Sequence, residues 1–355
     1  MDAPRSVPMF NRSKQEAIIN YSANGFDGQE MARGGIVHFY ACKLEGQLTV
    51  AGASNTRAAT LRGDALAVID RIRVRLNSQE NVYDMDAPGI IADNWYMMGD
   101  IPRDLDGQLG DGATANPTFS VPFIIAFTIP RRKVGVPIDT ALDLRANRVS
   151  KAEIECDWKS HTAINAAATG FTVAPRIIVR SFKAFDAPDG FLPGFLRRYK
   201  IQQTLTATNA RELIRLPTTF AYEGILLNAT VSGADNAAVY NKIRLVSGST
   251  VFEDHDPEIL NDAFGRIWNG RVRNYGFNST IALQNQYFSG QVSNQWDWDG
   301  WYPLEIPYDG NLREVQVASQ LAELLLELDV TIGGGTTVLS AYPYQYVPPP
   351  ARMSA

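Results

Sequence analysis

The sequence predicts an all-β protein made of two similar sandwiches in tandem. Three observations lead to this prediction: short segments that alternate apolar and polar residues, many turn-forming residues, and an internal duplication. The 355 residues exceed what one ordinary core needs and suit two domains. The 28 glycines and 19 prolines fit many short strands joined by turns.

Alternating side chains mark the clearest expected strands. In residues 68–76 the apolar side chains share one face, and the other face carries Arg71, Arg73 and Arg75. In residues 151–158 charged side chains alternate with Ala152, Ile154, Cys156 and Trp158. This period of two is typical of a half-buried strand whose second side meets solvent or a partner. Further strands are expected at residues 36–42, 47–51, 123–129, 173–182, 224–231, 280–283 and 337–346.

The two halves of the chain share a duplicated stretch. Val82–Trp95 aligns without a gap to Val251–Phe264, at a constant offset of 169 (251 − 82 and 264 − 95). The alignment pairs like residues, among them Asp84 with Glu253. Each copy follows a strand-like run with alternating basic residues, which extends the match toward the N-terminus.

A second match follows the first in the same order. Phe127–Pro130 corresponds to Leu304–Pro307, and Ile154–Trp158 corresponds to Leu326–Val330. The offset drifts to 177 (307 − 130) and then to 172 (326 − 154), as changes in loop length would produce. Two matches in the same order predict two copies of one fold.

The segment 321–332 fits two secondary structures. As a strand it places Leu324, Leu326, Leu328 and Val330 on one face. As a helix it gathers another set of leucines on one stripe, and its residues are strong helix formers. Its counterpart in the first copy alternates cleanly and includes the β-branched Ile154, so we predict a strand.

Three short helices are expected among the strands. Asp256 followed by Pro257 is a helix start signal, and Pro88 marks the matching helix at roughly residues 88–95. A third helix is expected at Ser13–Tyr21, where Ser13 and Glu16 have the spacing of a capping box.

Domain boundaries follow from the duplication and from turn-rich stretches. We expect an N-terminal arm with a short helix at 1–33 and a first sandwich at 34–185. A linker at 186–200 then leads to a second sandwich at 201–347 and a C-terminal tail at 348–355. The low-pattern stretches 99–117 and 269–302 precede equivalent strands and are expected to be surface loops.

This arrangement resembles the double jelly-roll major capsid proteins. The resemblance rests on Ile72–Trp95 and Ile243–Phe264, and on the paired strands that end at Pro130 and Pro307. It covers roughly residues 34–347 and implies two tandem eight-stranded jelly-roll sandwiches with short loop helices. Members of this family occur in tailless, membrane-containing bacteriophages of the tectivirus and corticovirus type and in larger eukaryotic DNA viruses.

The resemblance also implies a function and its partners. The chain would be a structural protein of the virion, synthesised in the host cytoplasm, that forms a homotrimer of pseudo-hexagonal outline. Such trimers would build an icosahedral shell around an internal membrane. The expected partners are further copies, neighbouring capsomers, penton and minor capsid proteins, and the internal lipid.

The resemblance places the N-terminal arm on the inner side of the shell. Its basic side chains would meet lipid headgroups and its apolar ones the bilayer, with candidates Arg5, Phe10, Arg12, Lys14 and Ile18. A helix packed on its own domain or on a neighbour is an equal alternative, because so short an apolar stripe binds membranes weakly.

Composition limits the function further. The net charge of −5 does not favour extensive contact with phosphates, so we expect no direct contact with nucleic acid. The sequence has no apolar run of the roughly 20 residues that a membrane span needs, and no apolar core of a signal peptide at its start. Cys42 and Cys156 lie in strand-like runs and are expected to be buried free thiols.

The sequence favours neither catalysis nor a cofactor. Its three histidines, His38, His161 and His255, have no accompanying nucleophile elbow, phosphate loop or zinc motif. An enzyme on two sandwiches, as in some amidases that cleave glycans from protein, is a third reading of the chain. It would need converging acids with shifted pKa values.

Two acidic clusters are weak metal candidates. Asp254 and Asp256 flank His255, and Asp297 and Asp299 mimic part of a calcium loop. The second cluster lacks the later acidic ligand at EF-hand spacing, and Asp256 is better explained as a helix cap. The prediction is therefore no metal.

An aromatic cluster supports the main alternative function. Exposed aromatic residues bind sugars or proteins, and the candidates are Trp296, Trp298, Trp301 and Tyr302. A tandem jelly-roll carbohydrate-binding protein would present them in a groove. We favour the other interpretation, in which they pack the base of the 269–302 loop or a trimer interface.

Overall fold

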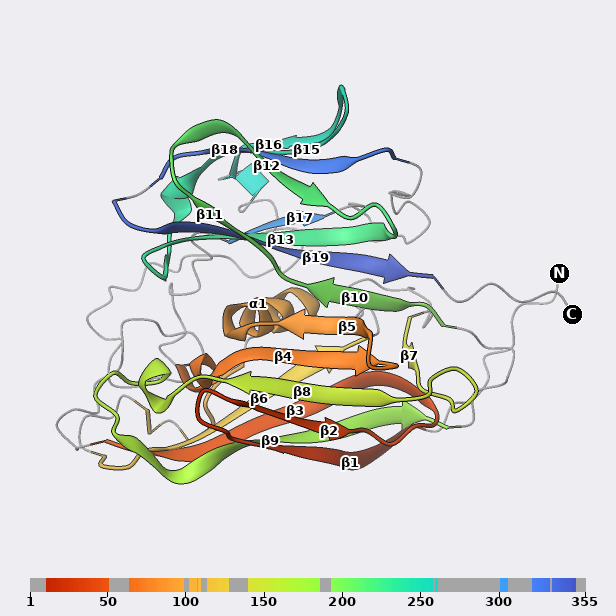
Figure 1. The fold of residues 1–355 in the computed structure, drawn as a ribbon, viewed down its shortest axis with the longest axis vertical. Coiled ribbons are helices and arrows are strands. Elements are labelled where there is room, and N and C mark those ends of the chain that lie inside the picture. The colour runs from red at the N-terminus through yellow and green to blue at the C-terminus, as the bar shows by residue number, and fades with distance from the viewer. Residues whose placement is uncertain are drawn as a thin grey trace, which may run out of the picture. The chain divides into compact units, whose positions relative to one another are not determined.

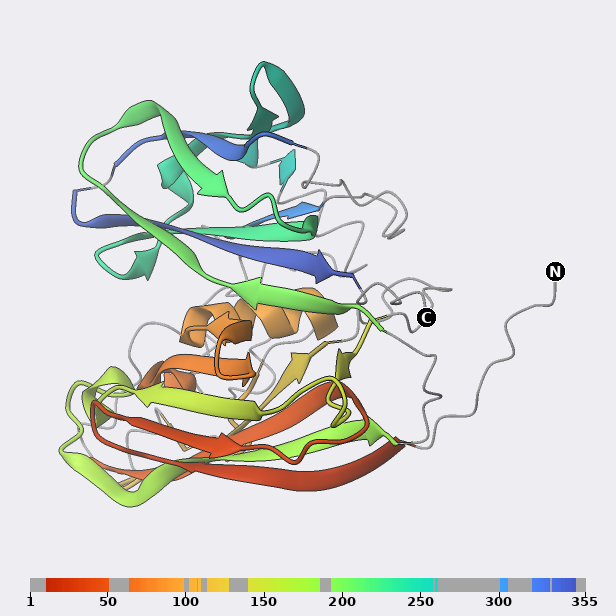
Figure 2. The same cartoon turned by 45° about the vertical axis from the view of Figure 1, so that its right-hand side comes forward.

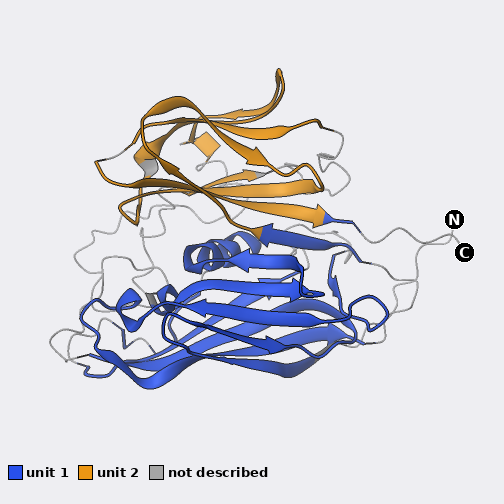
Figure 3. Ribbon diagram, in the orientation of Figure 1, with its two compact units in different colours: residues 1–198, 347–355 blue, residues 199–346 orange. Residues whose placement is uncertain are grey.

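The computed structural model describes residues 11–50, 64–98, 102–106, 108–109, 114–127, 140–185, 193–257, 259–260, 301–305, 321–332 and 334–348. The chain divides into two compact units, which Figure 3 shows in different colours. Unit 1 comprises Met1–Arg198 with Val347–Ala355, and unit 2 comprises Tyr199–Tyr346. Strands dominate both units, as the all-β prediction requires.

The first sheet of unit 1 has the strand order β1-β9-β3-β6, and the short strand β7 also pairs with β3. Its centre is the long antiparallel pair of β3 and β9, which brings distant parts of the sequence side by side (Figure 1). The bounds are β1 Asn11–Asn20, β3 Ile36–Thr49, β6 Thr118–Ala126, β7 Leu142–Asp143 and β9 Gly170–Ala184.

The second sheet of unit 1 has the order β10-β5-β4-β8-β2. Figure 2 shows it as a layer stacked on the first sheet. Alternation explains the packing: Ile72 and Val74 are fully buried, whereas the arginines between and beside them reach the other face. The bounds are β2 Phe26–Glu30, β4 Ile69–Leu76, β5 Glu80–Met85, β8 Ala152–Trp158 and β10 Phe195–Tyr199.

The helix α1 (Ala87–Met98) follows β5. It confirms the helix expected near residues 88–95. The Asp86 carboxylate accepts the backbone N–H of Gly89 at 3.0 Å and so caps the first turn. Asn94 joins the helix to β6, because its side chain accepts from the Ile124 N–H at 2.7 Å and donates to the Ile124 carbonyl at 3.0 Å. Short 3₁₀ turns are η2 Asp64–Val68, η3 His161–Ala163 and η4 Ala237–Val239.

The first sheet of unit 2 has β19 and β13 at its centre. β11 pairs with β19, and both β17 and the short β14 pair with β13. The register of β13 and β19 runs from Ala221↔Tyr346 to Val231↔Thr337. The bounds are β11 Ile201–Leu205, β13 Ala221–Val231, β14 Ala234–Asp235, β17 Trp301–Glu305 and β19 Thr337–Val347.

The second sheet of unit 2 has the order β12-β18-β15-β16. β18 lies within the segment 321–332, and the prediction of a strand there is confirmed. Its side chains Leu324, Leu326, Leu328 and Val330 are buried in the core of unit 2, while the residues between them are half-buried. The bounds are β12 Asn209–Leu216, β15 Tyr240–Ser247, β16 Thr250–His255 and β18 Leu324–Val330.

The two units repeat one eight-strand arrangement. The sheets β1-β9-β3-β6 and β2-β8-β4-β5 of unit 1 correspond strand for strand to β11-β19-β13-β17 and β12-β18-β15-β16 of unit 2. The helix also recurs in part: Leu260 N–H donates to the Asp256 carbonyl, as Ile90 N–H does to that of Asp86. The duplication inferred from the sequence is therefore present in the fold.

The helix expected at Ser13–Tyr21 is wrong, because these residues form most of strand β1. Ala17 and Ile19 are buried with a period of two, against β9. Glu16, expected to complete a capping box, instead forms a buried ion pair with Lys183 at 3.0 Å. Tertiary pairing with β9 therefore overrides the local capping signal.

Candidate functional site

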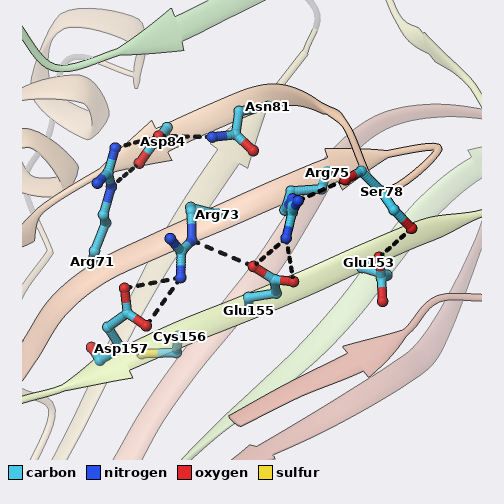
Figure 4. Close-up of polar contacts among 10 residues, drawn as sticks. All are labelled: Arg71, Arg73, Arg75, Ser78, Asn81, Asp84, Glu153, Glu155, Cys156 and Asp157. Carbon is cyan, nitrogen blue, oxygen red and sulfur yellow. Dashed lines mark hydrogen bonds and ion pairs between the residues drawn. The ribbon is translucent and has the colours of Figure 1, made fainter. Parts of the chain in front are cut away.

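The outer face of β4, β5 and β8 carries a ladder of ion pairs (Figure 4). Arg71 binds Asp84 with two hydrogen bonds, one of them 2.6 Å from Nη2 to Oδ2, and Asn81 donates to the same carboxylate at 3.0 Å. The pKa of Arg71 is raised, first by its hydrogen bond to Asp84 and then by that charge. The arginines expected to face solvent or a partner thus face acids of their own sheet.

The ladder continues toward the turn between β4 and β5. Arg73 lies 2.9 Å from the Asp157 carboxylate and 3.4 Å from that of Glu155, which also accepts from Arg75 at 3.0 Å. Three arginines therefore face three acids across the strands. Asp84 and Glu155 are buried while the three arginines stay partly exposed, so the ladder keeps buried carboxylates paired and this face of the sheet polar.

Unit 2 carries a matching ladder on the equivalent strands. Arg244 lies 2.9 Å from Glu327 across β15 and β18, as Arg73 faces Glu155 across β4 and β8. The pKa of Glu327 is lowered, mainly by hydrogen bonds from Arg211 and Arg244. The repeated pairing extends the duplication from the fold to individual charged contacts.

The register corrects one detail of the sequence alignment. Asp84 lies opposite Arg73, and Asp254 lies opposite Arg244. The structural counterpart of Asp84 is therefore Asp254, at an offset of 170 (254 − 84), whereas the alignment paired it with Glu253. The turn before β16 is one residue shorter than the turn before β5, which identity matching alone did not resolve.

The acidic metal candidates Asp254, in β16, and Asp256, just after it, have a basic neighbour. Lys242 lies 3.0 Å from Asp254 and 3.1 Å from Asp256. The pKa of Asp254 is lowered, mainly by the hydrogen bond from Lys242. In the described part of the chain no three metal-ligating side chains gather into a site. Asp297 and Asp299 lie outside the described residues.

Two members of the aromatic cluster, Trp301 and Tyr302, are buried. Trp301 and Tyr302 are 2% and 3% exposed in β17. The Trp301 ring stacks on the Tyr342 ring, with 5.4 Å between the ring centroids, and its Nε1 donates a hydrogen bond to Asp235 at 3.2 Å. The Tyr302 ring packs edge-on against the Tyr240 ring. These two residues pack unit 2, while Trp296 and Trp298 lie outside the described residues.

Of the five candidates for membrane contact, three lie in the strand β1 and two lie outside the described residues. Arg5 and Phe10 lie outside the described residues, whereas Arg12, Lys14 and Ile18 belong to β1. Lys14 is exposed and Ile18 is half-buried. Among the described residues, no helix combines the length and apolar character needed to cross a bilayer.

The three histidines occupy three different elements. His38 lies on β3, where burial lowers its pKa, and His161 lies in η3. His255 on β16 has its Nε2 2.9 Å from a Glu253 carboxylate oxygen. Both cysteines are buried free thiols, as predicted, and burial raises the pKa of each.

Two fully buried ion pairs were missed from the sequence. Arg198 of β10 lies 2.9 Å from Asp93 of α1. Lys183 pairs with Glu16. An alternating strand pattern predicts which residues face inward but not that an inward charge finds a partner elsewhere in the chain.

Sequence comparison with protein-family models and with curated proteins finds no match. Comparison with solved structures finds capsid proteins over nearly the whole chain. The major capsid protein of Sulfolobus turreted icosahedral virus matches with a TM-score of 0.67 and 10% identity, covering 98% of this chain and 100% of that one. The fold is a double jelly roll.

Two further structures agree with this identification of the fold. The major capsid protein P2 of bacteriophage PM2 has a TM-score of 0.58 and 13% identity, covering 95% of this chain and 98% of its own. The PBCV-1 protein VP54 has a TM-score of 0.58 and 12% identity, covering 98% and 95%. The predicted double jelly roll is therefore confirmed, with both rolls included in each match.

Proposed function

We propose that this double jelly-roll chain is the major capsid protein of an icosahedral virus. The observation that carries the proposal is the full-length match of both rolls to viral major capsid proteins. The chain contains two copies of one roll, so a homotrimer would contain six similar rolls. Six similar rolls around one axis suit packing on a hexagonal lattice. The role is structural, and no catalytic step is part of the proposal.

The proposed partners are those of a shell. Copies of the chain would form the trimer, and trimers would contact neighbouring capsomers, pentons and minor capsid proteins in the virion. The paired ladders keep the outer faces of the sheets β2-β8-β4-β5 and β12-β18-β15-β16 polar. An internal membrane beneath the shell and synthesis in the host cytoplasm stay predictions from the family resemblance.

The alternative, a tandem carbohydrate-binding protein, is not favoured. It required the aromatic cluster to line an exposed groove, but Trp301 and Tyr302 are buried. The similar structures are capsid proteins.

Electron microscopy of the purified chain tests the proposal. We expect particles of trigonal symmetry with pseudo-hexagonal outline, and closed shells or sheets under assembly conditions. Isolated monomers at micromolar concentration, with no higher assembly when the protein is concentrated, would contradict it.

A further inference from the structure

Beyond its ladder of ion pairs, the outer face of the sheet β12-β18-β15-β16 becomes apolar. At the next position along β15 and β18, Val246 lies opposite Leu325. At the equivalent position of unit 1, Arg75 lies opposite Glu153. The full row across four strands is Arg215, Leu325, Val246 and Val251 in unit 2, where unit 1 has Glu30, Glu153, Arg75 and Asn81. The two copies of the roll therefore differ in the chemistry of the same surface.

The apolar side chains of this row are accessible on unit 2. Val251 is 53% exposed and Leu325 is half-buried. Leu213 lies on the same face, opposite Glu327, and is 40% exposed. Apolar side chains gathered on an otherwise polar surface mark a site of contact with another molecule. Leu213, Leu325 and Val251 are called the unit 2 patch below.

A second apolar patch lies on the outer face of the sheet β1-β9-β3-β6 in unit 1. The register places Ile18 opposite Ile178 and Phe39 opposite Phe182, and these two phenyl rings stack with 4.3 Å between their centroids. The neighbouring Ile177 of β9 faces the core and is fully buried, whereas the outward side chains are half-buried. The unit 1 patch consists of Ile18, Phe39, Ala41, Ile124, Ile178 and Phe182.

The corresponding face of unit 2 is buried within the single chain. Tyr342 of β19 lies opposite Leu226 of β13, and they are 1% and 2% exposed. Trp301 of β17 stacks on Tyr342 and is equally buried. One roll thus has this face covered, while in the other roll it stays half-exposed and apolar.

Charges favour a contact between the two different patches over a contact between two identical ones. Arg176 and Arg180 flank Ile178 on the outer face of β9, and both are exposed. Two unit 1 patches would therefore bring like charges together, which disfavours their pairing. The unit 2 patch has exposed carboxylates beside it, since the side chains of Glu323 and Asp254 are 38% and 45% exposed. These acids complement the arginines of the unit 1 patch.

We propose that the unit 1 patch of one copy packs against the unit 2 patch of a second copy. Because the two patches are different surfaces, the contact is heterologous, and its repetition about a threefold axis closes a ring of three chains. The inference rests on the proposed function, because it names the two surfaces through which the trimer would form. Both patches lose their exposure to water in this contact, which supplies the driving force.

Two substitutions in the full chain test the two patches separately. Ile178→Glu and Leu213→Glu each place a carboxylate between two arginines on its own strand face, so the isolated chain should tolerate the change. These arginines are Arg176 and Arg180 on β9, and Arg211 and Arg215 on β12. An added charge opposes burial in an apolar contact, so each variant should weaken self-association at least tenfold in light scattering over a concentration series. The melting temperature of the dissociated chain should stay unchanged.

The matched control is Phe26→Lys on the polar outer face of unit 1. Phe26 lies on β2, the counterpart of β12, opposite Asp157, and is 53% exposed. The introduced charge again has an opposite charge beside it, but it lies outside both patches. This variant should associate as the unchanged protein does.

A mixture of the two glutamate variants tests the heterologous arrangement. Ile178→Glu keeps its unit 2 patch, and Leu213→Glu keeps its unit 1 patch. One intact contact can therefore form between one chain of each kind, but no ring can close. We expect a dimer near 78 kDa (2 × 39.1) at a concentration where each variant alone is a monomer.

The outcomes separate this inference from the proposed function. A trimer that resists either glutamate substitution, or that dissociates equally with Phe26→Lys, would overturn the inference alone. So would the absence of the mixed dimer. Binding of the unchanged protein to anionic lipid vesicles that Ile178→Glu abolishes, with the trimer intact, would assign the unit 1 patch to lipid and also overturn it. A chain that never self-associates would instead refute the capsid proposal.

Discussion

Arg198 and Asp93 form an ion pair that is closed off from solvent inside unit 1. Nη1 of Arg198 lies 2.9 Å from both carboxylate oxygens, and the two side chains are 0% and 1% exposed. The guanidinium also donates to the Ala126 carbonyl and lies over the ring of Tyr83. This pair joins the strand β10 to α1, so it attaches the chain that leaves the first roll to that roll.

Breaking this pair should be costly. Arg198→Met leaves the Asp93 carboxylate buried without its partner, and we expect a loss of about 3–5 kcal/mol in the free energy of unfolding. Urea denaturation followed by circular dichroism measures it. The control is Arg176→Met, which breaks a half-exposed pair with Glu45 and should cost no more than about 1 kcal/mol. Equal effects of the two substitutions would contradict the burial of Arg198.

The ion pair of Glu16 and Lys183 predicts a pH dependence. Burial raises the pKa of Glu16, but hydrogen bonds from Ser181, Lys183 and Ala32 together outweigh it, so the folded-state pKa is lowered. A lowered carboxyl pKa stabilises the fold above the ordinary value of about 4.5, and this stabilisation is lost as the pH falls through the folded-state value.

Glu16→Gln should therefore destabilise the protein most at neutral pH. We expect the difference in unfolding free energy between the unchanged protein and Glu16→Gln to shrink between pH 5 and 3, because the glutamate itself becomes neutral there. Urea titrations at several pH values measure this difference. A difference that stays constant through that range would show that Glu16 does not titrate as described.

The two thiols should not react with thiol reagents in the folded protein. Cys42 and Cys156 are buried, and burial raises the pKa of both, which disfavours the reactive thiolate. We expect no reaction with Ellman's reagent until urea is added, and then two thiols per chain. Val173→Cys, at an exposed position, is the positive control and should react at once. Rapid labelling of the unchanged protein would contradict the packing of β3 or β8.

Substitutions in β18 can distinguish the strand from the helix that the sequence also allowed, because the two structures bury different leucines. Leu328→Ala empties a fully buried site and should cost about 2–5 kcal/mol. Leu325→Ala changes a half-buried residue on the other face and should cost less than about 1 kcal/mol. A helix would place Leu325 and Leu328 on the same stripe, so equal costs in thermal or urea unfolding would favour the helix.

Much of the double jelly roll could be predicted from the sequence because its signals are local. Alternation predicted β4, β8 and β18, turn residues separated the strands, and the repeated stretch after Val82 revealed the second roll. The helix α1 followed from Pro88 in its first turn. Alternation, turns and the start of α1 depend on neighbours within about ten residues, whereas the second roll and the strand β18 were inferred by comparing the two copies of the repeat.

What the sequence did not predict depends on distant partners. Ser13 and Glu16 fit a capping box, but Lys183 on β9 holds Glu16 in a strand, 167 residues away (183 − 16). Nothing in the sequence around Arg198 indicates that its side chain is buried, because its partner Asp93 is 105 residues away in the chain (198 − 93). The buried position of Trp301 likewise follows from its stacking on Tyr342, which only the fold brings together.

The central claim is that two jelly rolls in one chain form a trimeric shell subunit. Light scattering on a sizing column measures the solution mass of the purified chain directly. The account predicts a trimer near 117 kDa, three times the 39.1 kDa of the chain. A single species at the monomer mass at micromolar concentration would contradict it.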